Sequence, residues 1–281
     1  MIELGENSYG KRAIRLVKVT RDPVGDQVRD LTVDVALEGD FAAAHTAGDN
    51  ALVVATDTMK NTVYALAADQ LSGAVEAFGT ALATHFLAFP QVRRATVDLR
   101  EHRWTPIAAG GRPAPDAFRR AGDATRTATV AATREAIVVE SGVEDLVVMK
   151  TRGSAFAGFP RDPYTTLGEA HDRIMATKVT ATWRHAGPAV EWDASHEAIS
   201  ATLLEVFAQH ESDSVQHSIW LMGSAMLERH AEIDEVRMTL PNLHHWPVDL
   251  APLGGTNRGE IFVATTEPHG LIEAVVRRSP S

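Results

Sequence analysis

The chain contains no cysteine among its 281 residues. This absence excludes disulfide bonds, thiol nucleophiles and thiolate metal ligands together. An excess of basic residues is also missing, since 37 Asp and Glu residues outnumber 27 Lys and Arg residues. The resulting net charge of −10 argues against a nucleic-acid-binding protein, which needs a basic face to neutralise phosphates.

Long apolar segments are missing as well. No run approaches the roughly 18 residues that a membrane-spanning helix requires. The N-terminal residues lack the basic-then-apolar pattern of a secretory signal, and the C-terminus does not match a peroxisomal signal. We therefore expect a cytoplasmic protein that acts on neither nucleic acid nor membranes. The hydrophobic content of 44% is that of a globular protein with a full core.

The hydrophobic pattern predicts the same order of elements twice. In the first half we expect strands at 13–20 and 31–38, helices from residue 56 and at 72–89, strands at 91–104 and 126–139, and an irregular Gly- and Pro-containing loop over 106–124. In the second half we expect strands at 143–151 and 177–185, a short helical piece near 166–173, two helices carrying Ile199 and Ile219, and strands at 235–240, 260–266 and 271–277.

This order is strand-strand-helix-helix-strand-strand, repeated. Consecutive hairpins favour antiparallel sheets with helices on one face, so the expected fold class is α+β. We expect two modules, over residues 1–139 and 140–281.

A Thr-Asp-Thr cluster, Thr56-Asp57-Thr58, lies where the apolar run Leu52–Ala55 gives way to a helical pattern. Two interpretations are open. The side-chain oxygens could cap the first helical turn. Alternatively, the helix N-terminus could bind an anionic ligand, because its backbone donors and dipole favour negative charge.

Motifs for several common chemistries are missing: a phosphate loop, a dinucleotide-binding Gly-x-Gly-x-x-Gly, a His-Glu-x-x-His and a Gly-x-Ser-x-Gly. The pair His244-His245 suggests a metal only weakly, because neighbouring side chains on a strand point to opposite faces. Polar or aromatic groups instead stand out in six ordered stretches: Tyr9-Gly10-Lys11, Gly48 to Tyr64, Gly158 to Arg173, Ser214-Val215-Gln216, Leu240 to His244 and Pro268 to Glu273.

On these six stretches the chain resembles urate oxidase (uricase) over nearly its whole length. The resemblance implies the tunnelling fold (T-fold), with two tandem ββααββ modules per chain. It also implies a homotetramer, in which the antiparallel sheets form a β-barrel and the active sites lie at subunit interfaces.

The resemblance implies a substrate site for urate, a planar purine anion. A guanidinium fork and an amide suit the polar edges of such a ring, and a phenyl group suits its face. The implied binding residues are Thr56, Asp57, Phe156, Arg173, Val215, Gln216 and Asn242, with Asn242 holding dioxygen or water above the ring.

The implied catalytic residues are Lys11 and Thr56, with His244 assisting proton transfer. The implied reaction is the oxidation of urate by dioxygen and water to 5-hydroxyisourate and hydrogen peroxide. No flavin, haem or metal cofactor is implied, because urate itself supplies the electrons.

Two departures from the family pattern are visible. Ala114–Phe118 stands where many uricases have a His-x-His-Ala-Phe segment, and Leu243 stands where lysine is common. Two other interpretations remain. A pterin-type enzyme of the same fold would need a zinc site of His or Cys ligands, and no suitable cluster is visible. A purine-binding protein without turnover would need only Arg173, Gln216 and Phe156, and not Lys11, Thr56 and His244.

Overall fold

The structure is a computed structural model that describes residues 2–187 and 190–279. The chain divides into two compact units. The first comprises residues up to 142 together with 184–196, and the second comprises 143–183 and the residues from 197 onward. The expected module boundary at 139/140 concerns the repeated order of elements and stays a prediction. Within the described ranges, no helix is long and apolar enough to cross a membrane.

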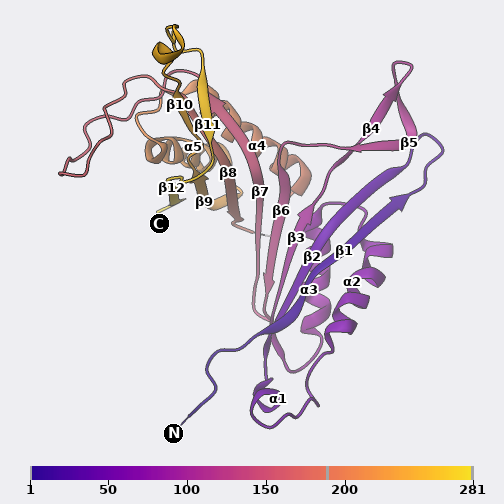
Figure 1. The fold of residues 1–281 in the computed structure, drawn as a ribbon. Helices are drawn as coiled ribbons and strands as arrows, with labels where there is room; N and C mark the ends of the chain where they lie inside the picture. The colour runs from indigo at the N-terminus through magenta and orange to yellow at the C-terminus, as the bar shows by residue number, and fades with distance from the viewer. Residues whose placement is uncertain (1, 188–189, 280–281) are drawn as a thin grey trace. The chain divides into compact units, whose positions relative to one another are not determined.

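The first unit contains an antiparallel sheet in the order β1-β2-β3-β6. Helices α2 and α3 lie along one face of these strands (Figure 1). The elements are β1 (Tyr9–Thr20), β2 (Gln27–Gly39), a short α1 (Ala42–Thr46), α2 (Thr56–Gln70), α3 (Val75–Leu87), β3 (Val92–Glu101), β6 (Thr125–Ala132) and the beginning of β7 (Ile137–Lys150).

The core of this unit follows from alternation along β2. Leu31, Val33, Val35 and Leu37 face the helices and are fully buried. Phe78 of α3 is buried against this face, at the helical spacing that the sequence predicts. Each fully buried side chain of this size stabilises the fold by about 1.5–3 kcal/mol. The opposite face of the sheet is polar, as one-sided strands require.

The segment 106–124, expected to be an irregular loop, is instead mostly a β-hairpin of β4 (Trp104–Ala109) and β5 (Arg112–Arg120). Its turn is Gly110-Gly111, with φ of 60° and 79°. A two-residue turn with positive φ at both positions matches the right-handed twist of a hairpin, and two glycines adopt it without strain. The expectation was wrong because the prolines of this segment masked the Gly-Gly turn signal.

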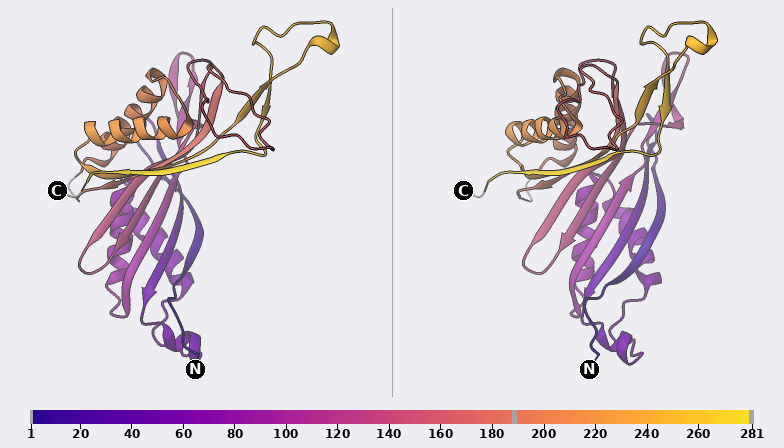
Figure 2. Two further views of the ribbon diagram at one scale, coloured as in Figure 1. Left: turned by 90° about the vertical axis from the view of Figure 1, so that its left-hand side faces the viewer. Right: turned by 60° about the vertical axis from the view of Figure 1, so that its left-hand side comes forward.

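The second unit contains the remainder of β7 and the strand order β7-β8-β9-β12. Its elements are β8 (Met175–His185), most of α4 (Trp192–Gln209), α5 (Val215–Arg229), β9 (Ile233–Pro241), β10 (His244–Pro247), the 3₁₀ turn η1 (Ala251–Leu253), β11 (Phe262–Thr265) and β12 (Leu271–Arg277). Helix α5 packs on β9 and β12 (Figure 2), and β10 and β11 form a separate two-stranded sheet.

The short helix expected near 166–173 is absent from this described segment, and that prediction was wrong. The backbone pairs with residues 153–156 instead. The amide of Phe156 donates to the carbonyl of Ala170 (2.7 Å), and that of Arg173 donates to Ser154 (2.8 Å). These bonds replace the i→i−4 pattern, and Gly168 in the segment disfavours a helix in any case.

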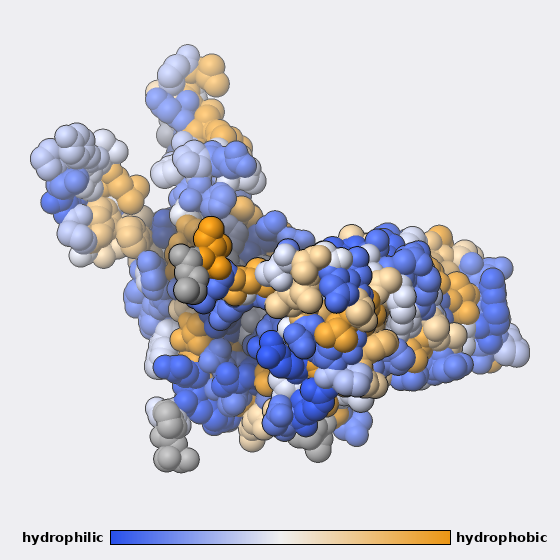
Figure 3. Space-filling view, turned by 90° about the horizontal axis from the view of Figure 1, so that it is seen from below, coloured by the Kyte–Doolittle hydropathy of each residue, from blue (hydrophilic) through white to orange (hydrophobic). Residues whose placement is uncertain are grey.

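The ββααββ order therefore occurs twice, each time with an extra hairpin between the third and fourth strands, and the α+β class is confirmed. Large apolar side chains also remain at the surface, including Tyr164 (88% exposed) and Leu253 (79% exposed). On the face shown in Figure 3, hydrophobic residues lie among hydrophilic ones.

Candidate active site

The second unit contains a cavity of about 640 Å³. Four of the residues that the sequence predicts for the site line it: Phe156, Arg173, Asn242 and His244. Phe156 comes from the loop after β7, Arg173 from the segment just before β8, Asn242 from the turn between β9 and β10, and His244 from the start of β10. The rest of the lining comprises Thr151, Leu167, Gly168, Ala170, Asp172, Ile174, His245, Trp246, Pro247, Gly259 and Phe262.

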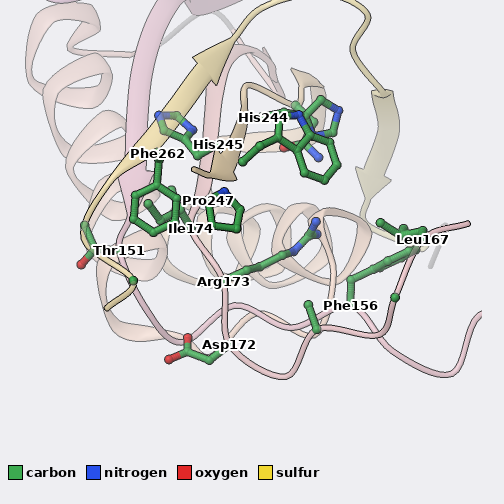
Figure 4. Close-up of a pocket in the computed structure, with 15 residues that line it drawn as sticks. Thr151, Phe156, Leu167, Asp172, Arg173, Ile174, His244, His245, Pro247 and Phe262 are labelled. Atoms are coloured by element: carbon green, nitrogen blue, oxygen red, sulfur yellow. The ribbon is translucent and has the colours of Figure 1, made fainter. Parts of the chain in front are cut away.

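Arg173 and Phe156 form one wall of the cavity. The guanidinium carbon of Arg173 lies 5.4 Å from the centre of the Phe156 ring. Figure 4 shows the Arg173 side chain reaching into the cavity beside Phe156, with His244 on the opposite wall. Burial lowers the pKa of Arg173, but an arginine remains charged at neutral pH. The wall therefore offers a partly desolvated planar cation next to an aromatic face.

The start of α5 is tied to the same loop. The amide of Ala155 donates to the carbonyl of Ser212 (2.7 Å). Ser214 caps α5, because its hydroxyl accepts the amide of the third residue on (3.1 Å). Val215 is buried and Gln216 is exposed in the first turn of α5, and neither lines the cavity. The structure thus brings four predicted binding or catalytic residues together in the cavity. Val215 and Gln216 lie at the start of α5, outside the cavity lining.

Asn242 is held by a backbone hydrogen bond and His244 by an aromatic contact. The amide of Asn242 donates to the carbonyl of Gly270 (2.8 Å). The His244 ring stacks on Trp246, with centres 5.2 Å apart and planes inclined by 26°. Burial lowers the pKa of His244, and the charge of Arg173 lowers it further. The imidazole is therefore neutral at pH 7 and can both donate and accept a proton.

Trp246 was not predicted from the sequence. The signal was available, because residues two apart on a strand share a face and Trp246 follows His244 by two. His245 also lines the cavity, and its Nδ1 lies 3.0 Å from the carbonyl of Leu243. Among the residues that the structure describes, no three His, Asp or Glu side chains gather in a way that could hold a metal ion.

Lys11, Thr56 and Asp57 lie in the first unit. Helix α2 begins at Thr56 after Ala55, and within the described chain no side chain caps this N-terminus. The capping interpretation of the Thr-Asp-Thr cluster was therefore wrong, and backbone N–H groups of the first turn remain available to an anion. Lys11 lies in β1 opposite Val35.

Asp57 connects these residues electrostatically. Its carboxylate accepts hydrogen bonds from Lys60 and from the Asn61 side chain. These partners lower the pKa of Asp57, Lys60 having the largest effect, and the charge of Lys11 also contributes. The positive charge of Lys11 thus acts on a carboxylate in the first turn of α2, more weakly than Lys60 does.

Tyr9 fastens the loop before α2 to β1. Its hydroxyl donates to the carbonyl of Val54 (3.1 Å) and accepts the amide of Val54 (2.8 Å). The ring packs edge-on against Phe41, with centres 4.8 Å apart. Burial raises the pKa of Tyr9, so the hydroxyl stays protonated. Lys11 follows Tyr9 by two residues, and Thr56 follows Val54 by two residues. The hydrogen bonds between Tyr9 and Val54 therefore hold the backbone of Lys11 in place relative to that of Thr56.

A family model described as Uricase matches residues 7–131 and 139–273 of the chain. The curated Uricase of Arthrobacter globiformis is 45% identical over 281 residues, which are 100% of this chain and 91% of that protein. The Uricase of Dictyostelium discoideum is 36% identical, covering 100% of this chain and 99% of the relative. The crystal structure of uricase from Arthrobacter globiformis aligns with a TM-score of 0.94, covering 100% of this chain and 96% of that one.

Proposed function

Because the chain belongs to the uricase family and is therefore a urate-oxidising enzyme with the tunnelling fold, we propose that it converts urate, dioxygen and water to 5-hydroxyisourate and hydrogen peroxide. In this reaction urate loses two electrons, and dioxygen takes them up with two protons. Water supplies the new hydroxyl group. The observation that carries the proposal is the cavity in which Arg173, Phe156, Asn242 and His244 meet.

Each wall of the cavity has a role in this proposal. Arg173 binds the polar edge of the purine anion through its fork, and Phe156 stacks on the ring face. The amide of Val215 and the side chain of Gln216 bind the other edge, which requires the exposed start of α5 to meet the bound ring. Asn242 holds dioxygen, and later water, above the ring through its side-chain amide.

Proton transfer is assigned to Lys11, Thr56 and His244. Removal of a proton makes urate electron-rich enough to react with dioxygen directly. Lys11, in its unprotonated amine form, accepts this proton through the Thr56 hydroxyl and becomes the ammonium, and the neutral His244 passes protons toward the peroxide product. Asp57 and the uncapped start of α2 bind the five-membered ring. The electrostatic effect of the Lys11 charge on Asp57 supports treating Lys11, Thr56 and Asp57 as one half of the site.

We further propose that this half belongs to the cavity of a neighbouring subunit in a homotetramer. Oligomers commonly build sites at symmetric interfaces, where one surface patch of each chain meets another. Trp246 lines the cavity and is 48% exposed, and Tyr164 and Leu253 are exposed in the stretches that connect lining residues (156–167 and 247–259); such exposed apolar residues support an interface there. A cytoplasmic location and the module boundary at 139/140 remain predictions from the sequence.

The test begins with metal-stripped protein and urate in air-saturated buffer. We expect catalytic loss of the ultraviolet absorbance of urate with one peroxide released per urate. Lys11→Ala should lower kcat by roughly 10²- to 10⁴-fold while urate still binds, as removal of a general base does. Lys18→Ala is the matched control, because Lys18 lies on the same strand but bonds to the carbonyl of Ala68.

Arg173→Ala should chiefly weaken binding. Loss of charge-assisted bonds worth about 3 kcal/mol would raise KM by roughly 100-fold. Arg161→Ala is its control, since Arg161 also lies over a phenyl ring, that of Phe159 (5.3 Å), but outside the cavity lining. Binding of urate without turnover in the wild-type protein would favour a purine-binding protein instead.

A further inference from the structure

The strand that carries Lys11 contains a β-bulge. Lys11 pairs with Val35 and Ile14 pairs with Val33, so Arg12 and Ala13 together oppose the single residue Asp34. Ala13 has a φ of 55°, in the left-handed region. Alanine rarely adopts this region, because its Cβ crowds the backbone there, and the conformation persists only when its surroundings hold it.

The bulge decides which face of the sheet Lys11 occupies. Side chains alternate along a regular strand, so residues three apart point to opposite faces. Ile14 is buried in the core beneath the helices. In a regular strand Lys11 would therefore lie on the helix-free face. The extra residue reverses the alternation. Lys11 pairs with Val35, directly paired residues share a face, and Val35 faces the helices, so Lys11 lies on the helix side of the sheet.

Lys11 is thus directed to the side of the sheet where α2 begins. Two observations agree with this direction. The charge of Lys11 acts on Asp57 in the first turn of α2. Further along the same face, the ammonium of Lys18 donates to the carbonyl of Ala68 in α2 (2.8 Å). Without the bulge, the proposed base would be separated from Thr56 and Asp57 by the sheet.

Asp34 holds the bulge from the other face. Its Oδ1 accepts the amide of Ala13 at 2.5 Å, the backbone donor that the bulge removes from the ladder. Its Oδ2 accepts from the guanidinium of Arg12 (3.3 Å), and Arg100 forms an ion pair with it at 3.6 Å. Only 12% of the Asp34 side chain is exposed. The bond from the Ala13 amide to this carboxylate is charge-assisted and therefore stronger than a bond between neutral backbone groups, so removal of the carboxylate favours a regular strand.

We propose that Asp34 is a positioning residue for the proton-transfer step: by accepting the Ala13 amide it stabilises the bulge that turns Lys11 toward Thr56. Asp34 acts through the backbone alone, because its side chain lies on the opposite face from Lys11. This inference rests on the proposed function, in which Lys11 is the base.

The decisive comparison is among three variants. Asp34→Ala removes the acceptor, and kcat should fall by roughly 10- to 100-fold, as small misplacements of reacting groups do, while the Kd for urate stays within about threefold. Asp34→Asn keeps an oxygen for the Ala13 amide, and its kcat should stay within about threefold of wild type. Asp98→Ala is the control: Asp98 forms an ion pair with the Arg12 side chain (3.7 Å) on the same face and accepts from Thr129, but its carboxylate does not bond to the Ala13 amide.

A second change tests the mechanism. Ala13→Gly removes the steric cost of the left-handed conformation, so Asp34→Ala combined with Ala13→Gly should recover most of the lost kcat. If Asp34→Ala does not fold, Ala13→Val replaces it. Valine is strongly disfavoured at positive φ, and with Asp34 intact its kcat should fall while Ala13→Gly alone keeps the wild-type rate.

Wild-type kcat in Asp34→Ala, or an equal loss in Asp34→Ala, Asp34→Asn and Asp98→Ala, would overturn the inference, and so would failure of Ala13→Gly to restore the rate. The proposed function fails on different results. It fails if the wild-type protein does not consume urate, or if Lys11→Ala keeps full activity.

Discussion

The hydroxyl of Tyr9 provides a test of how the loop before α2 is held. Tyr9→Phe removes one oxygen and keeps the ring that packs on Phe41. Val54, only 6% exposed, then loses the partner of both its amide and its carbonyl. Each lost hydrogen bond contributes about 1 kcal/mol, and the Val54 amide and carbonyl are left without their partner. The free energy of unfolding should therefore fall by about 2–4 kcal/mol. At about 2–4 °C per kcal/mol for a chain of this size, Tm should fall by roughly 4–16 °C.

Activity should respond separately from stability. Thr56 follows Val54 by two residues, so a loosened loop displaces the Thr56 hydroxyl from the substrate. We expect kcat to fall by about 3- to 30-fold below the melting range, with a smaller change in KM, because the Arg173 wall is untouched.

Thermal unfolding and steady-state urate oxidation measure the two effects. Tyr64→Phe is the matched control, because Tyr64 lies half-exposed on α2. This substitution should change the free energy of unfolding by no more than about 0.5 kcal/mol. A Tyr9→Phe protein with the Tm and kcat of wild type would refute the role of this hydroxyl.

Three further predictions use other parts of the chain. Burial and neighbouring positive charge lower the pKa of His244, so the neutral ring persists as pH falls below about 6.5; the acid limb of kcat should lie below that value and disappear in His244→Asn, which a pH–rate profile measures. Arg126→Met leaves the fully buried Glu76 carboxylate without its 2.7 Å partner, and stability should fall by about 3–5 kcal/mol in denaturant unfolding. Gly10→Ala places a Cβ 1.9 Å from a carbonyl oxygen of β2, whereas Gly5→Ala meets nothing within 4 Å; only the first should lower the yield of folded, active protein.

Periodicity predicted most of the fold because the elements are strongly one-sided. The alternation of β2 and the three-to-four spacing of α3 each leave one possible buried face, and the structure uses it. The segment 166–173 was misjudged for a different reason. Its backbone bonds are made to Ser154 and Phe156, and pairings between distant irregular segments leave no periodic pattern in a sequence.

The residues of the candidate site were found through family motifs, but their supports were not. The bulge at Arg12-Ala13 contains no glycine, the residue that would have indicated a positive φ in the sequence. Asp34 resembles any polar residue on the solvent-exposed face of a strand. The two hydrogen bonds between the Tyr9 hydroxyl and the backbone of Val54 join residues 45 positions apart. Such contacts depend on how two segments approach in space, which local propensity does not determine.

In the proposed enzyme each active site is completed by two subunits, and co-assembly of two inactive variants tests this most directly. Lys11→Ala and Arg173→Ala would be expressed together and purified as mixed oligomers, and urate loss and peroxide release would be measured. If one subunit supplies Lys11 and its neighbour supplies Arg173, mixed pairs contain one intact site, and random mixing should restore about a quarter of wild-type activity. Mixed oligomers no more active than either variant alone would contradict the shared site.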